Sequence, residues 1–150
     1  MKAVLQRIRR AALTADGIPH SKCEAGMLIL LGVAPDDTER EADFLVKKCA
    51  NLRIFEDEHG KMNLSPLTAK AEVMVVSQFT LLGSCAEGNR PYFGAAARPE
   101  IAEPLYEYFC ARMAEHLPTK TGVFGADMQI EIICDGPVTI LMDTEELMKK

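Results

Sequence analysis

The sequence predicts an α+β fold: a curved mixed or antiparallel sheet, or an open barrel-like sheet, covered by two helices. Two observations carry this prediction. Apolar or alternating runs of strand length outnumber helical patterns, and the two helical patterns lie between strand runs instead of forming a separate block. With 150 residues, 48% of them hydrophobic, the chain can bury a substantial core, so residues 1–150 are expected to form a single domain.

The expected strands are short and either apolar or alternating: residues 3–8, 27–33, 73–78, 128–133 and 138–142. The first can continue past Arg10 toward Thr14. A tight corner at Asp135-Gly136-Pro137 is expected to join the last two strands. Gly-Pro is unusual between two apolar strands, because proline removes a backbone donor.

Two segments are expected to be helices. Asp37 or Thr38 can cap the first, since short polar side chains accept hydrogen bonds from the first free amides. Its apolar positions recur at helical spacing: Ala42, Leu45, Cys49 and Leu52. The second helix is expected to begin near Pro99, with apolar positions four apart: Ile101, Leu105, Phe109 and Met113.

Three polar or glycine-rich segments are expected to be turns or loops. Residues 56–63 have the composition of a turn with Gly60 at its tip, and residues 118–128 have that of a loop. Residues 82–97 contain three glycines and a proline. A loop of this length in a small domain is usually functional or mobile.

Charge and cysteine content limit the classes of partner. A net charge of −5 argues against a broad nucleic-acid-binding surface, so DNA is not an expected partner, although a local contact with one end of an RNA remains open. No apolar run is long enough to span a membrane, and the first residues do not resemble a secretory signal. Five scattered cysteines without a C-x-x-C pair predict free thiols in a cytoplasmic protein.

The common catalytic motifs are missing from the sequence. The three histidines show no metal-ligand spacing, and there is no P-loop, G-x-G-x-x-G or G-x-S-x-G motif, so neither a metal nor a cofactor is expected. Cys134 beside Asp135 could be a thiol nucleophile or a small core residue. The segment Ser77–Leu81 ends an apolar strand with polar side chains. These could cap local amides, or the strand end could offer two amides as an oxyanion hole.

Several segments, taken in order, resemble the D-aminoacyl-tRNA deacylase family nearly from end to end: "MKAVLQRI", "LLGVAPDDTE", "NLRIFEDEHGKMNLS", "VVSQFTL", "AEPLYEYF", "TGVFGADMQI" and "DGPVTILMDT". The resemblance implies a homodimeric cytoplasmic enzyme without a cofactor. Its substrate would be the ester between a D-amino acid and the terminal adenosine of tRNA. If L-amino acids are excluded by collision of their side chains, glycyl-tRNA, including glycine mischarged on tRNA(Ala), is expected to be cleaved as well, because glycine has no side chain. In the family the Gly-Pro peptide is cis and enters the active site of the other subunit, where it excludes L-amino acids.

The resemblance also assigns the candidate site residues. Those at the strand end carry the chemical step: Ser77, Gln78, Phe79 and Thr80. Those that bind substrate or hold the Gly-Pro motif are Gly136, Pro137, Arg7, Phe124, Met128 and Thr139, although Phe124 and Met128 could equally be core residues. Either Thr80 is the nucleophile, or water attacks with help from a ribose hydroxyl. We favour water, because no base lies beside Thr80 in the sequence.

The chain departs from the family pattern in two places. Cys134 stands where the family usually has Asn, and the loop "CAEGNRPYF" is less basic than is usual there. Two other hypotheses therefore stay open at this point. One is a non-catalytic module that binds an RNA end or a small molecule on the same scaffold, and the other is a hydrolase that uses Cys134.

Overall fold

The structure is a computed structural model, and it describes residues 1–149. Its elements in chain order are β1 (Lys2–Ala15), β2 (Ile18–Cys23), β3 (Gly26–Gly32), α1 (Glu39–Ala50), β4 (Phe55–Glu56), β5 (Met62–Leu64), α2 (Pro66–Ala69), β6 (Glu72–Ser77), the 3-10 turn η1 (Phe79–Leu82), α3 (Pro99–Ala114), β7 (Thr119–Thr121), β8 (Met128–Asp143) and α4 (Thr144–Leu147).

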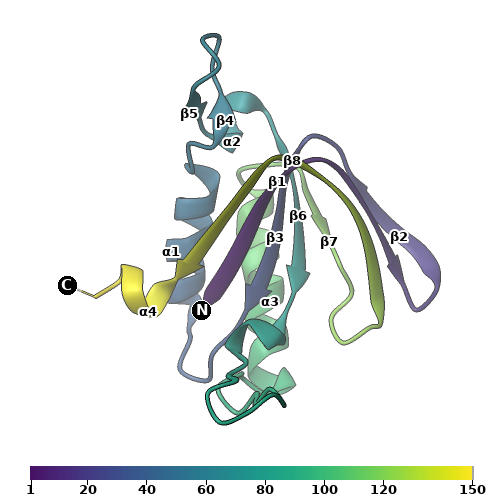
Figure 1. The fold of residues 1–150 in the computed structure, drawn as a ribbon, viewed down its shortest axis with the longest axis vertical. Coiled ribbons are helices and arrows are strands. Elements are labelled where there is room, and N and C mark those ends of the chain that lie inside the picture. Colours follow the sequence, from purple (N-terminus) through teal and green to yellow (C-terminus); the bar gives the residue numbers. More distant parts are fainter. Residues whose placement is uncertain (150) are drawn as a thin grey trace.

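The long strand β1 organises a mixed sheet (Figure 1). On one side it pairs antiparallel with β8 over nearly its whole length. On the other side its first half pairs with β3 and its second half with β2, both antiparallel. Beyond β3, the strands β6 and β7 follow in parallel. The predicted mixed sheet with interspersed helices is therefore confirmed.

The sheet curves until its ends meet, as a nearly closed barrel (Figure 1). The hydroxyl of Ser21 on β2 donates to the carbonyl oxygen of Thr121 on β7 at 3.0 Å. One core lies between the sheet and helices α1 and α3, with Leu5, Leu45 and Phe109 fully buried. A second core fills the inside of the curve and contains mainly strand residues: Ile8, Leu13, Leu28, Met74 and Val76.

Both predicted helices form, but the buried face of the second was partly wrong. Thr38 caps α1 in a capping box with Glu41, as the sequence indicates. In α3, Phe109 is buried, whereas Ile101 is 42% exposed and Leu105 is only half-buried. A strict four-residue spacing advances about 40° beyond each full turn, so it drifts off the core face. The actual stripe alternates its spacing and runs through Ala102, Tyr106, Phe109 and Met113.

The strand predictions need four corrections. β4 and β5, on either side of the turn at Gly60, were not predicted as strands. β2 was not predicted, because its polar residues alternate weakly, and the expected loop at residues 118–128 contains β7. The two expected C-terminal strands are one strand, β8, and the corner at Gly136-Pro137 is a bulge within it. Both halves pair with the same partner, β1, so the chain never reverses. The turn at Gly60 is confirmed: it joins β4 to β5, and its φ of 73° requires the freedom of glycine.

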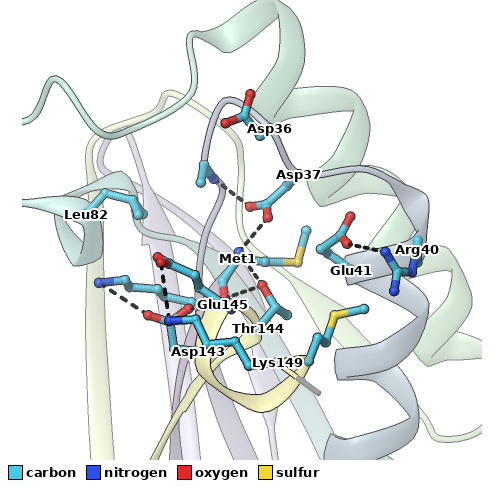
Figure 2. Close-up of a pocket in the computed structure, with 13 residues that line it drawn as sticks. Met1, Asp36, Asp37, Arg40, Glu41, Leu82, Asp143, Thr144, Glu145 and Lys149 are labelled. Atoms are coloured by element: carbon cyan, nitrogen blue, oxygen red, sulfur yellow. Dashed lines mark hydrogen bonds and ion pairs between the residues drawn. The ribbon is translucent and has the colours of Figure 1, made fainter.

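A buried polar network joins the start of β1 to the beginnings of α1 and α4 (Figure 2). The Met1 ammonium donates to Oδ1 of Asp37 at 2.6 Å and to Oγ1 of Thr144 at 2.7 Å. The other oxygen of Asp37 accepts from the Ala34 amide at 2.6 Å. These groups lie beside a hollow of about 420 Å³.

Within residues 1–149, none of the helices combines the length and the apolar character that crossing a membrane requires. All five cysteines are free thiols.

Candidate active site

The end of β6 and the turn η1 hold two free backbone donors, on Phe79, which lines a cavity, and on Thr80, which follows it in the chain and is not among the lining residues. The Gln78 amide completes the ladder by donating to the Leu31 carbonyl at 2.7 Å, and the chain then enters the 3-10 turn. The next two N–H groups, on Phe79 and Thr80, lie at the start of the turn, where no carbonyl of the turn itself can accept from them. Within residues 1–149 they have no hydrogen-bond partner. Two adjacent free donors at a strand end are the components that an oxyanion hole requires.

The side chains at this strand end offer no activated nucleophile. The side-chain amide of Gln78 donates to the hydroxyl oxygen of Thr80, which is exposed. In the part of the chain that the structure describes, no basic side chain bonds to that hydroxyl, and none of the three histidines lines the cavity. A hydroxyl without an adjacent base is poorly activated.

The cavity beside this strand end has a volume of about 400 Å³ and mostly apolar walls. Its lining comes from the ends of β3 and β6, the loop before α3, α3 itself and the loop after β7: Leu31, Val33, Ser77, Gln78, Phe79, Phe93, Ala96, Ala97, Arg98, Pro99, Ala102, Tyr106, Phe124 and Gly125. The volume and the composition of the walls suit a small organic group held by a few polar contacts.

Aromatic pairs shape two sides of this cavity. Phe79, 56% exposed, packs edge-on against Phe93 with ring centroids 5.2 Å apart. Phe124 tilts against Tyr106 at 6.0 Å. The Tyr106 hydroxyl donates to the Val75 carbonyl at 2.8 Å and accepts from an amide of the loop after β7, and burial raises its pKa. Tyr106 therefore stays a neutral clamp between β6 and that loop.

The second part of the candidate site is the bulge of β8. In the register with β1, Thr139 pairs with Gln6 and Cys134 with Ile8, so residues 135–138 all face the single residue Arg7. The Gly136–Pro137 peptide bond is cis, and both residues are exposed. Gly136 has a φ of 123°, which a residue with a Cβ rarely adopts.

Arg7 is buried and holds this bulge from behind. Its Nε donates to the Asp135 carbonyl at 3.2 Å, and its Nη1 donates to the Ile54 carbonyl at 2.7 Å. The Asp135 carboxylate lies 3.3 Å from Nε and also 3.4 Å from the exposed Arg9. The planar fork of the guanidinium suits this double attachment, because its donors are fixed relative to one another.

The strand end and the bulge lie far apart within one chain. Ser77 pairs with Leu31, and Leu31 with Ala3, four residues from Arg7 along β1. At about 3.3 Å per residue along a strand and about 4.8 Å between strands, the separation is about 20 Å. The residues at the strand end and those at the bulge are not brought together by the fold of one chain.

The other sequence candidates have separate positions. Phe124 lines the cavity, whereas Met128 packs on the second core and is not among the lining residues. Thr139 is exposed on β8, two residues after Pro137. Cys134 is also exposed, and within the described residues it has no hydrogen bond or ion pair to a histidine. No cluster of potential metal ligands is found in residues 1–149.

Sequence reasoning missed several wall residues, notably Tyr106, Phe93 and Arg98. A signal for Tyr106 was present, because Ala102, Tyr106, Phe109 and Met113 also form a helical stripe. Phe93 and Arg98 lie in or beside a long loop without periodicity, so only the folded chain places them at the cavity.

The barrel-like fold holds a strand end with two free backbone donors, an arrangement that suits stabilisation of the oxyanion formed in ester hydrolysis. The family model described as D-Tyr-tRNA(Tyr) deacylase matches residues 4–143, and the chain belongs to this family. The protein is accordingly a D-aminoacyl-tRNA deacylase.

Two solved structures are similar over nearly their whole length. One is described as "c-Myc DNA Unwinding Element Binding Protein"; it is 41% identical with a TM-score of 0.90, covering 95% of this chain and 98% of that one. The other is described as a structural analysis of a probable eukaryotic D-amino acid tRNA deacylase. It is 15% identical with a TM-score of 0.83, covering 94% of this chain and 97% of that one, and it supports the fold alone.

Proposed function

We propose that this protein works as a homodimer in which each subunit lends its Gly136-Pro137 bulge to the strand-end site of the other. The reaction is hydrolysis of the ester between a D-amino acid and the terminal adenosine of tRNA. The observation that carries the proposal is the separation of about 20 Å between the two parts in one chain, by strand spacing and register. A second copy is the simplest source of the missing part.

An exposed apolar face supports a second copy as partner. Val4 pairs with Leu30 on one side and with Leu141 on the other, so the three side chains share one face of the sheet. Leu141 is 78% exposed, and it lies on β8, whose outer edge has no strand partner within residues 1–149. Such a face on an edge strand is commonly covered by association.

The bulge is suited to reading handedness through backbone atoms. L- and D-amino acids have the same volume, so pocket size cannot separate them, and even a whole methylene is worth only about 1–3 kcal/mol. Fixing the ester at the strand end and the amine at the bulge leaves one direction for the side chain. An L side chain then meets protein, which excludes it, whereas a D side chain points to solvent. We therefore expect broad activity on D-aminoacyl-tRNAs.

Glycine has no side chain to exclude. Glycyl-tRNA, including glycine mischarged on tRNA(Ala), is therefore expected to be cleaved. We expect the protein to act in the cytoplasm, where aminoacylated tRNA is used.

For the chemical step, the free amides of Phe79 and Thr80 would hold the ester oxygen as negative charge develops. One such donor contributes on the order of 10²–10³ in rate. Water is the nucleophile, and the neighbouring ribose hydroxyl of the tRNA assists it. In this mechanism Thr80 acts through its main chain, and its side chain is held by Gln78.

A deacylation assay on one tRNA charged with the D-, the L- or the glycyl ester tests the proposal. We expect cleavage of the D- and glycyl esters and survival of the L-ester. Sedimentation of the protein at assay concentration tests the dimer. A monomer that retains full discrimination would contradict the exchange of bulges, and cleavage of the D-ester without the glycyl ester would contradict exclusion by collision.

Three other functions would give different outcomes. A non-catalytic module would bind the RNA end and leave every ester intact. A hydrolase that uses Cys134 would lose activity in Cys134→Ser, whereas the proposed mechanism would be little affected. The 41% identical structure is described as a DNA-element binding protein, so DNA binding is the third. The net charge of −5 disfavours it, and a titration with duplex DNA measures it directly.

A further inference from the structure

Three exposed cations surround a hollow between α1 and β8, away from the strand-end cavity. Lys47 and Lys48 lie in the last turn of α1, and Arg53 follows the helix. The hollow measures about 630 Å³ and has an apolar floor with a basic rim: Phe44, Lys47, Lys48, Asn51, Leu52, Arg53 and Met142. We call it the basic hollow.

The cations of the basic hollow are not neutralised by acidic neighbours. Among residues 1–149, no ion pair includes Lys47, Lys48 or Arg53. One turn earlier on α1, Asp43 is already engaged by Tyr108 and Arg112. A locally positive surface on a chain of net charge −5 is a specific place for an anion to bind.

Helix stability explains only part of this arrangement. Lysines in the last turn interact favourably with the helix dipole, which accounts for Lys47 and Lys48. Arg53 lies beyond the helix, so the dipole does not account for it. Its guanidinium donates to the main-chain carbonyl of Asn63 at 2.9 Å and to the side chain of the same residue. This attachment holds the third cation at the rim.

The basic hollow lies at the same end of the molecule as the bulge of β8. Arg53 precedes Ile54, whose carbonyl accepts from Arg7 at 2.7 Å, and Arg7 also bonds Asp135 beside Gly136. In the proposed dimer the bulge enters the partner's strand-end site, where the 3′ end of the tRNA lies. The basic hollow therefore flanks the path by which the RNA approaches that site.

We propose that the basic hollow binds the sugar-phosphate backbone of the tRNA acceptor stem while the charged 3′ end occupies the partner subunit's site. This inference rests on the proposed function and adds a contact to it. Phosphate contacts position a nucleic acid without reading its sequence, so one such surface serves many tRNAs. It also provides an electrostatic contact that the weakly basic loop at residues 85–93 does not.

The test compares two triple variants that each neutralise three cations. Lys47→Gln, Lys48→Gln and Arg53→Gln remove the rim; Lys22→Gln, Lys70→Gln and Lys120→Gln remove exposed cations elsewhere. The measurement is kcat/KM for D-aminoacyl-tRNA and for 3′-D-aminoacyl-adenosine, which lacks the stem. We expect the rim variant to lower the ratio of kcat/KM for full tRNA to kcat/KM for 3′-D-aminoacyl-adenosine about tenfold near physiological salt. The slope of log(kcat/KM) for tRNA against log salt concentration should fall by roughly one per lost phosphate contact.

An unchanged preference and salt slope in the rim variant would overturn the inference, as would an equal loss in the control variant. If the rim variant melts much earlier than the parent, Lys47→Gln with Lys48→Gln leaves Arg53 in place and gives the same test. If the wild-type protein cleaves neither ester, the proposed function is contradicted instead. A titration of the wild-type protein and the rim variant with uncharged tRNA then tests the contact on its own. If the rim variant loses binding to duplex DNA but keeps binding to tRNA, the basic hollow is a DNA site and the RNA assignment is overturned.

Discussion

Arg7 donates a hydrogen bond from Nε to the carbonyl oxygen of Asp135, 3.2 Å away, immediately before the Gly-Pro peptide of β8. Arg7 is only 6% exposed, and its guanidinium also donates to the carbonyl oxygen of Ile54 at 2.7 Å. One buried side chain thus ties the exposed bulge to the segment that follows α1. The shape of the bulge depends on this attachment as well as on its own sequence.

Arg7→Lys should lower kcat on D-aminoacyl-tRNA by about 10²-fold, the scale expected from a displacement of about 1 Å in a positioning group. A single ammonium keeps the charge but cannot replace the fixed fork that reaches both carbonyls. Arg9→Lys is the control, because Arg9 pairs with the same Asp135 from an exposed position. Equal rates in the two variants would show that the fork is not needed.

Gly136→Ala should abolish most activity while leaving the fold intact. A Cβ at this position would lie 2.8 Å from Cγ2 of Val138 and 3.2 Å from Nη2 of Arg7, at a φ of 123°. Gly60→Ala is the matched control, since Gly60 also has a positive φ but open space around it. Its cost is about 1–2 kcal/mol of stability from backbone conformation. If both variants keep the parental rate, the shape of the bulge does not matter for catalysis.

Thr80→Ala should retain much of the parental kcat, because the mechanism uses the amide of this residue and attack by water. The variant removes the hydroxyl that Gln78 contacts and leaves the main chain unchanged. Single-turnover rates on D-aminoacyl-tRNA measure the effect. Complete loss of activity in a folded variant would favour Thr80 as the nucleophile.

Asp37→Asn should lower the free energy of unfolding by about 3 kcal/mol, the usual cost of breaking a buried ion pair. The two carboxylate oxygens accept from the Met1 ammonium and from the Ala34 amide, each at 2.6 Å (Figure 2). An Asn can accept only one of these bonds, and its NH2 group would face the other donor. Denaturant unfolding measures the loss, with exposed Asp36→Asn as the control; equal effects would argue against the network.

The stability should fall as the pH rises above about 9, and Cys49 should contribute to that fall. Burial raises the pKa of Cys49 to about 12, whereas an unfolded thiol ionises near pH 8.5. Between these values only the unfolded state loses the proton, so the thiol costs about 1.4 kcal/mol of stability per pH unit. Cys49→Ala should have a shallower alkaline slope than the parent, and exposed Cys85→Ala should not. Identical slopes would mean that Cys49 does not contribute.

Local sequence patterns predicted much of the fold, because helix caps, turns and buried strands each depend on residues close together in the chain. Thr38 caps α1, Gly60 forms the tip of a turn, and the apolar run at residues 73–78 becomes the buried strand β6. The apolar pattern gave a wrong prediction in α3, where two rows of apolar residues could each form the buried face. Leu105 and Tyr106 are both large, and only packing against the first core decides that Tyr106 is buried.

The sequence by itself determined the class of fold, the family resemblance and the two segments, Ser77–Leu81 and Asp135–Pro137, that carry the candidate site. The tertiary structure decided that the second segment is a bulge in one strand, because pairing of both its halves with β1 can be known only from the register. It also decided that Arg7 lies under that bulge, and that the two segments are about 20 Å apart within one chain, by strand spacing and register. These are relations between residues distant in the chain, and side-chain periodicity reports only on neighbours.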